Sequence, residues 1–225
     1  MEKRKRLKKR MKGITLIELL VVVAIITILA AILLPYIGNR TEDARIAAME
    51  DTIATMRTAT LLMFNDTSVF PVNWNDLINN TTLTTWRGPY ISSKYALITT
   101  NTANDTAQSA SPWKTNLILF ADNNGANLEY FGATTGGVPR FGRAVALGIV
   151  NPLVSAGGPP VIPLTSLQKI DQDLDDGVNN TGYIIYLNIT TTPLTLTGLA
   201  GGSFQGYNTS PGGTTMLAVF LNGVR

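Results

Sequence analysis

A long apolar stretch over residues 14–34 constrains the fold of this chain more than any other part of its sequence. A helix over this stretch would be about 31 Å long at a rise of about 1.5 Å per residue, which is close to the thickness of the hydrocarbon core of a bilayer. The stretch holds a single charged side chain, Glu18, near its beginning. Because a carboxylate is costly to place in lipid, we expect Glu18 to have a specific partner.

Two ordinary explanations of such a stretch fit the sequence poorly. A secretory signal peptide has a shorter apolar region, about 7–15 residues, followed by a small-residue cleavage site. A plain membrane anchor needs neither a carboxylate near its start nor a glycine, Gly13, at its junction with the preceding segment. A cut between Gly13 and Ile14 would create an α-amino group, which is the obvious partner for Glu18.

The positive charge of the chain is concentrated before this stretch. Residues 1–12 hold eight of the 18 basic residues and one of the 15 acidic residues, so the chain after residue 13 has 10 basic and 14 acidic residues. A basic run before an apolar helix is typical of segments that stay on the cytoplasmic side of a membrane. The acidic remainder argues against a nucleic acid as the main partner, because phosphate binding depends on clustered basic side chains.

The 225 residues include no cysteine and no histidine. Disulfides, thiolate metal sites and nucleophilic arrangements that use histidine as the base are therefore excluded. We accordingly expect a structural protein and not an enzyme.

Residues 13–19 read Gly-Ile-Thr-Leu-Ile-Glu-Leu, and this segment resembles the processing site of type IV prepilins and type II secretion pseudopilins. The resemblance implies that a membrane aspartic prepilin peptidase cleaves after Gly13 and methylates the new amino group of Ile14. It also implies that Glu18 is the carboxylate used in assembly and that Pro35 is a helix-kinking proline. Ile14 departs from the phenylalanine that is commonest at its position in the family.

The same resemblance implies the partners and the location of the protein. The precursor would be a single-pass protein of the bacterial inner membrane, with its head on the periplasmic or outer side. The processed subunit would join a homo- or hetero-oligomeric filament with other pilins or pseudopilins, in the periplasm or at the cell surface. Its further partners would be the prepilin peptidase and an inner-membrane assembly platform.

Apolar residues recur at spacings of three and four after Pro35, which predicts an amphipathic helix over residues 36–64. The stripe consists of Ile46, Met49, Ile53, Met56, Thr60 and Met63. We expect it to pack against a head domain and to have no cofactor role. The expected organisation is a cleaved leader over residues 1–13, a transmembrane or filament-core helix over 14–35, the amphipathic helix, and a β-rich head over 65–225.

The head is rich in Thr, Asn and Gly and contains several strand-like segments. Residues 117–120 and 127–131 flank a turn at 122–125 and predict a β-hairpin. Residues 144–150, 183–189 and 216–221 predict further strands. We expect an α+β fold, in which an antiparallel sheet packs on the second half of the long helix; by resemblance, this is the pilin fold.

Two aromatic elements favour one branch of the family over the other. Residues 86–91 and 111–113 resemble segments of the major pseudopilins of type II secretion, although their spacing is longer here. The simpler interpretation is that these aromatic side chains anchor a loop on the sheet. We therefore expect a type II secretion pseudopilin, with a major or minor pilin of a type IV pilus, acting in adhesion, twitching or DNA uptake, as the alternative.

Residues 164–177 predict a short helix with its N-cap at Thr165 or Ser166 and its end at Gly177. Four carboxylates crowd the C-terminal end of this helix, which is the unfavourable end for negative charge. They are Asp171, Asp173, Asp175 and Asp176. Their spacing partly matches an EF-hand loop and makes them candidate Ca²⁺ ligands, although the glycine is one position late and position 12 is not Glu. The alternative is a solvated acidic helix end paired with Lys169 or Arg225.

Overall fold

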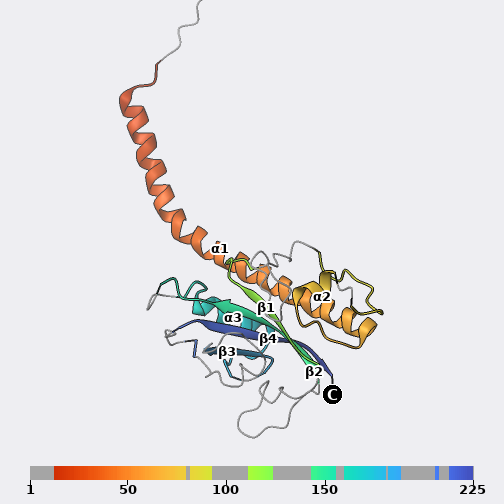
Figure 1. The fold of residues 1–225 in the computed structure, drawn as a ribbon. Helices are drawn as coiled ribbons and strands as arrows, with labels where there is room; N and C mark the ends of the chain where they lie inside the picture. Colours follow the sequence, from red (N-terminus) through yellow and green to blue (C-terminus); the bar gives the residue numbers. More distant parts are fainter. Residues whose placement is uncertain are drawn as a thin grey trace, which may run out of the picture. The chain divides into compact units, whose positions relative to one another are not determined.

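The computed structural model describes residues 13–79, 82–92, 111–123, 143–155, 160–180, 182–188, 206–207 and 213–224. The chain divides into two units, Met1–Asp43 and Ala44–Arg225. Helices and a four-stranded antiparallel sheet confirm the predicted α+β fold (Figure 1). Residues 1–12 of the predicted leader lie outside the described residues.

The helix α1 (Leu16–Thr67) begins in the first unit and ends in the second. It is one unbroken helix that continues through Pro35. A proline removes only one backbone donor, and a long helix tolerates that loss with a bend. A kink at Pro35 therefore remains a prediction.

In the second unit, the sheet contains β1 (Leu117–Asp122), β2 (Arg143–Asn151), β3 (Ile184–Asn188) and β4 (Thr215–Val224). The strands lie in the order β1-β2-β4-β3, and every neighbouring pair is antiparallel. The strands predicted over 144–150, 183–189 and 216–221 are thus confirmed. The described partner of β1 is β2, while residues 127–131, the predicted hairpin partner, lie outside the described residues.

The apolar stripe of the amphipathic helix is buried as predicted. All six of its side chains are at most 5% exposed. They share one core with one face of the sheet, represented by Leu119, Leu147 and Val219, and with the short helices α2 (Trp74–Ile78) and α3 (Leu164–Leu174). The alternating sequence positions, such as Ala146 and Ala218, form a second buried cluster on the opposite face of the sheet.

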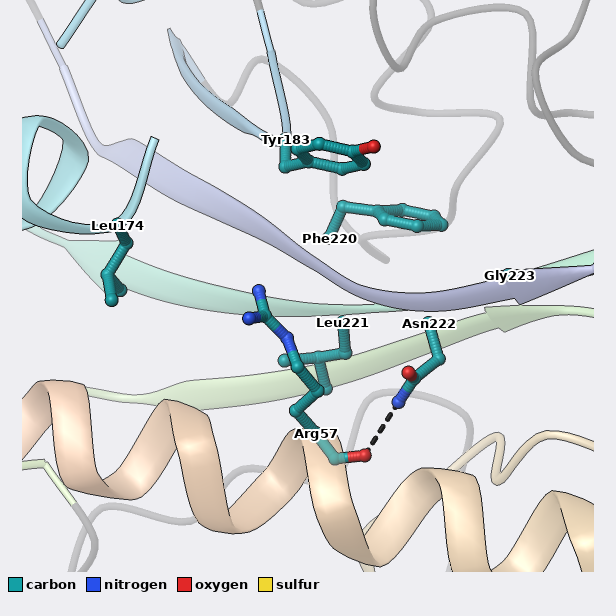
Figure 2. Close-up of a pocket in the computed structure, with 7 residues that line it drawn as sticks. All are labelled: Arg57, Leu174, Tyr183, Phe220, Leu221, Asn222 and Gly223. Atoms are coloured by element: carbon teal, nitrogen blue, oxygen red, sulfur yellow. Dashed lines mark hydrogen bonds between the residues drawn. The ribbon is translucent and has the colours of Figure 1, made fainter. Parts of the chain in front are cut away.

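A polar contact fixes β4 on α1 within this core. The Asn222 side-chain amide donates to the backbone oxygen of Arg57 at 2.6 Å (Figure 2). It also donates to Thr60 Oγ1 at 2.7 Å. The Thr60 hydroxyl in turn donates to the Arg57 carbonyl at 3.1 Å. These bonds explain how Thr60 occupies a fully buried position in an otherwise apolar stripe.

The Trp86–Tyr90 element anchors a loop, as the simpler interpretation predicts, but the hydrogen bonds of its aromatic side chains go to α1 and α2 and not to the sheet. The Trp86 indole donates to the Asp76 carbonyl at 2.8 Å, and the Tyr90 hydroxyl donates to Asp66 at 2.8 Å. The two rings meet edge to face, with their centroids 5.8 Å apart. A side chain at Gly88 would collide with the Trp86 ring, so local packing requires this glycine.

We predict that Met56→Ala lowers the free energy of unfolding by about 2–5 kcal/mol, because it opens a cavity in a fully buried position. Leu61→Ala on the same helix is the control: Leu61 is 46% exposed, and we expect a change below about 1 kcal/mol. Guanidinium unfolding of the full chain in detergent, followed by tryptophan fluorescence, measures both. Equal losses would contradict the assignment of the buried stripe.

A second prediction concerns Glu50, whose Oε1 is buried and has no hydrogen-bond partner among the described residues. Desolvation and the neighbouring Asp173 carboxylate raise the pKa of Glu50, and Lys169 opposes them. Because the folded pKa is raised, the contribution of Glu50 to stability is present at low pH and is lost as the pH rises through that pKa. Glu50→Gln should therefore raise the melting temperature at pH 7 and change it little at pH 4.

The control for this comparison is Asp51→Asn, an equal change in charge at an exposed neighbouring position. The melting temperatures of both variants are measured at pH 7 and at pH 4. The same gain for both at pH 7 would mean that net charge, and not the buried Glu50 carboxylate, is responsible.

Candidate functional site

Thr15 and Glu18 cap the N-terminal end of α1 through reciprocal hydrogen bonds. The Thr15 N–H and its hydroxyl both donate to Glu18 Oε2 at 2.8 Å, while Thr15 Oγ1 accepts from the Glu18 N–H at 3.3 Å. This is a capping box, with Thr15 as the N-cap and Glu18 as the third helical residue. The carboxylate therefore has local partners in the uncut chain.

The sequence contained the signal for this contact, which our reasoning missed. A threonine followed three residues later by glutamate, directly before an apolar run, is the usual pattern of a capping box. We had considered only an amino group at Ile14 as the partner of Glu18. Thr15 thus joins the residues of the candidate site.

Gly13 and Ile14 precede the helix in an open position. Ile14 is 79% exposed, and a Cβ placed on Gly13 would meet no atom within 4 Å. The backbone at Gly13 does not adopt a positive φ. Among the described residues, neither steric crowding nor backbone conformation therefore requires a glycine at position 13.

The helix that follows is apolar on every side and uncovered. Residues Leu16–Leu33 have a mean hydropathy of 3.1, none of them is buried, and they form the one stretch of the described chain that is long and apolar enough to cross a membrane. The Thr27 hydroxyl donates to the Val23 carbonyl at 2.8 Å, so the helix satisfies this polar group internally. Such a helix is compatible with lipid.

A second candidate site lies at the end of α3. The N-cap of this helix is Pro163, which has no side-chain hydrogen bond to the helix, so the predicted N-cap at Thr165 or Ser166 is wrong by two or more residues. The proline already supplies the fixed backbone angle of a helix start, and Thr165 and Ser166 lie within the first turn. Gly177 has a positive φ of 73°, three residues after the last helical residue.

The structure brings together three of the four predicted acidic ligands. Asp171, Asp175 and Asp176 each place one oxygen within 4.8 Å of the other two. Asp173 is outside this group: its side chain is exposed and lies near Glu50. The described geometry therefore does not bring all four carboxylates together, as an EF-hand-like site would require.

Asp171 is the buried member of this cluster. Its Oδ2 accepts from the Tyr207 hydroxyl at 2.8 Å, and its Oδ1 is buried without a hydrogen-bond partner among the described residues. Burial raises the pKa of Asp171 to about 6. The Tyr207 hydroxyl and the Gly177 backbone N–H, which both interact with the carboxylate, oppose this increase, and the charges of Asp175 and Asp176 add to it. No local pattern predicts the contact between this carboxylate and Tyr207, which is 36 positions away.

The other two carboxylates organise the turn that follows α3. Asp175 Oδ2 accepts from the backbone N–H groups of Tyr183 and Ile184, the second at 2.9 Å, and Asp176 Oδ1 accepts from Val178 N–H at 2.8 Å. Asp175 thereby connects the end of α3 to the start of β3.

A hollow near this turn carries no evident chemistry. It is lined by Arg57, Leu174, Tyr183, Phe220, Leu221, Asn222 and Gly223 (Figure 2). The rings of Tyr183 and Phe220 lie 6.0 Å apart at 31°, and the Arg57 side chain extends from α1 toward β4. The backbone oxygen of Arg57 is already bound by Asn222.

Comparison with known proteins bears on the first site. Residues 8–34 match the family model of the prokaryotic N-terminal methylation motif. No curated protein and no solved structure matches the chain. The matched segment contains Gly13, Ile14, Thr15 and Glu18, and it supports a membrane-anchored, pilin-like or pseudopilin precursor. The chain thus carries the N-terminal signature of the type IV prepilins and pseudopilins.

Proposed function

We propose that this chain is a filament subunit that is cleaved between Gly13 and Ile14, methylated at Ile14 and assembled through the apolar part of α1. Within this class we propose a pseudopilin of a type II secretion system. The observation that carries the proposal is a capped, uncovered apolar helix, residues Leu16–Leu33, that begins three residues after Gly13.

The open position of Gly13 supports cleavage at that residue. The described part of the chain has no need of a glycine there, and a glycine allows another molecule to approach the backbone closely. A peptidase has to bind the substrate backbone in an extended form, and a glycine leaves the most room for it. The preceding basic residues keep this segment at the cytoplasmic face of the membrane.

The capping box supports a dual role for Glu18. In the bilayer, Thr15 satisfies the carboxylate locally, which lowers the cost of holding a charge in the apolar segment. Cleavage leaves the Thr15 N–H in place and adds a positive charge at Ile14. In a filament, by resemblance to the family, the carboxylate would pair with the amino group of a neighbouring subunit and so set the axial register.

The choice of a secretion pseudopilin rests on the elements at residues 86–91 and 111–113. Their aromatic residues have structural roles in this head, so the elements support the choice only through their resemblance. Deletion of the gene tests it directly. We expect loss of exoprotein secretion with surface filaments and twitching intact; loss of twitching with secretion intact would favour the pilus alternative.

We predict that the mature protein begins at Ile14 and carries an N-methyl group. Gly13→Leu should leave full-length protein in the membrane, because the substituted side chain blocks the approach of the peptidase while the open surroundings leave the fold unchanged. Intact-mass measurement of membrane fractions detects both forms. A mature start elsewhere in the wild type would contradict the proposal.

We predict that Glu18→Leu is inserted and cleaved like the wild type but assembles poorly, because the register contact is absent. The processed fraction is measured by mass and the assembled fraction by shearing and pelleting filaments. Thr27→Leu is a matched control within the same apolar helix and should assemble normally. Wild-type assembly by Glu18→Leu subunits alone would remove the role proposed for the carboxylate.

A further inference from the structure

The end of α3 presents three carboxylates at the spacing of ligands around one cation. One oxygen each from Asp171, Asp175 and Asp176 lies within 4.8 Å of the other two. Calcium binds oxygen ligands at about 2.3–2.6 Å, so two ligands on opposite sides of the ion are about 5 Å apart. One ion between these oxygens can therefore contact all three.

The buried oxygen of Asp171 is an independent sign of a missing partner. The residue is fully buried, and the Tyr207 hydroxyl occupies only its Oδ2. Oδ1 is buried and lacks a hydrogen-bond partner among the described residues, and Asp171 belongs to the group of converging carboxylates. A buried carboxylate oxygen without a partner is destabilising, and a bound cation would supply that partner.

The remaining ligands are held in place before any ion binds. Backbone N–H groups of β3 fix Asp175, and a Val178 N–H fixes Asp176. Gly182 lies against the Asp175 carboxylate. Its φ is positive, 74°, and a Cβ at this position would collide with the carboxylate. A carboxylate has about four lone-pair sites, so one that accepts a hydrogen bond can still bind a cation.

We propose that Asp171, Asp175 and Asp176 bind Ca²⁺ at the junction of α3, β3 and Tyr207. A hard divalent cation suits a set of oxygen ligands, and the chain has no cysteine or histidine to bind a softer metal. Calcium tolerates irregular ligand geometry, whereas magnesium requires a nearly ideal octahedron. Water molecules complete the coordination. The ion links the end of a helix, the start of a strand and the Tyr207 segment, and it stabilises the head against unfolding.

The test uses the full chain in detergent, stripped of metal with EDTA. Thermal unfolding at pH 7.5 is compared in 1 mM CaCl₂, in 1 mM MgCl₂ and in EGTA, with calorimetric titration of CaCl₂ as the direct measure of binding. We expect calcium to raise the melting temperature by at least about 3 °C and magnesium to raise it less. No calcium shift and no heat of binding in the wild type would overturn the proposal.

The variants identify the site. Asp171→Asn should abolish both the shift and the heat, and Asp176→Asn, at an exposed position, provides the same test if the first variant fails to fold. Asp173→Asn is the matched control, since it removes the same charge from the same helix outside the cluster, and it should retain the calcium response. A response that survives Asp176→Asn, or that is lost in Asp173→Asn, would overturn the assignment of the ligands.

Discussion

The packing of α1 on one face of the sheet is the interaction on which the head depends. Six side chains of the helix, from Ile46 to Met63, meet the apolar positions of the strands in one core. The short helices α2 and α3 complete the same core and have too few residues to be stable alone. Without the second half of α1, this face of the sheet would be exposed to water.

The two halves of α1 differ in the burial of their apolar side chains, although they belong to one helix. The second half has one buried stripe and polar flanks, whereas residues Leu16–Leu33 are apolar all round and uncovered. A helix that is apolar on all sides, as residues Leu16–Leu33 are, requires lipid or other apolar helices around it. The proposed passage from membrane to filament exchanges one such environment for the other, and Thr15 keeps Glu18 partnered in the uncut chain.

Much of this arrangement follows from local patterns in the sequence. The three-and-four spacing of Ile46 to Met63 predicted the buried stripe, and the apolar runs near Val145, Ile185 and Val219 predicted strands. Burial on both faces of the sheet follows from the near-continuous apolar character of β2, a pattern typical of strands covered on both sides.

Contacts between distant residues could not be predicted in this way. The pairing of β1 with β2 and the bond between Asn222 and α1 depend on the tertiary fold. The acidic cluster is the clearest case, because regular spacing suggested four equivalent ligands. The fold separates Asp173 from the others and assigns Asp175 to the start of β3. The start of α3 at Pro163 was also missed, since the proline sets the backbone angle without a side-chain cap.

The position of β4 in the sheet has a consequence for biogenesis. β4 follows the other three strands in sequence, yet it lies inside the sheet, paired with both β2 and β3. A chain that is synthesised from its N-terminus can form α1 early, but its sheet remains in two parts until residues 215–224 pair with β2 and β3. Folding of the sheet is therefore completed by the strand that comes last of the four in sequence. A head without β4 lacks an inner strand and leaves an edge of β2 and an edge of β3 open for a chaperone or protease to recognise.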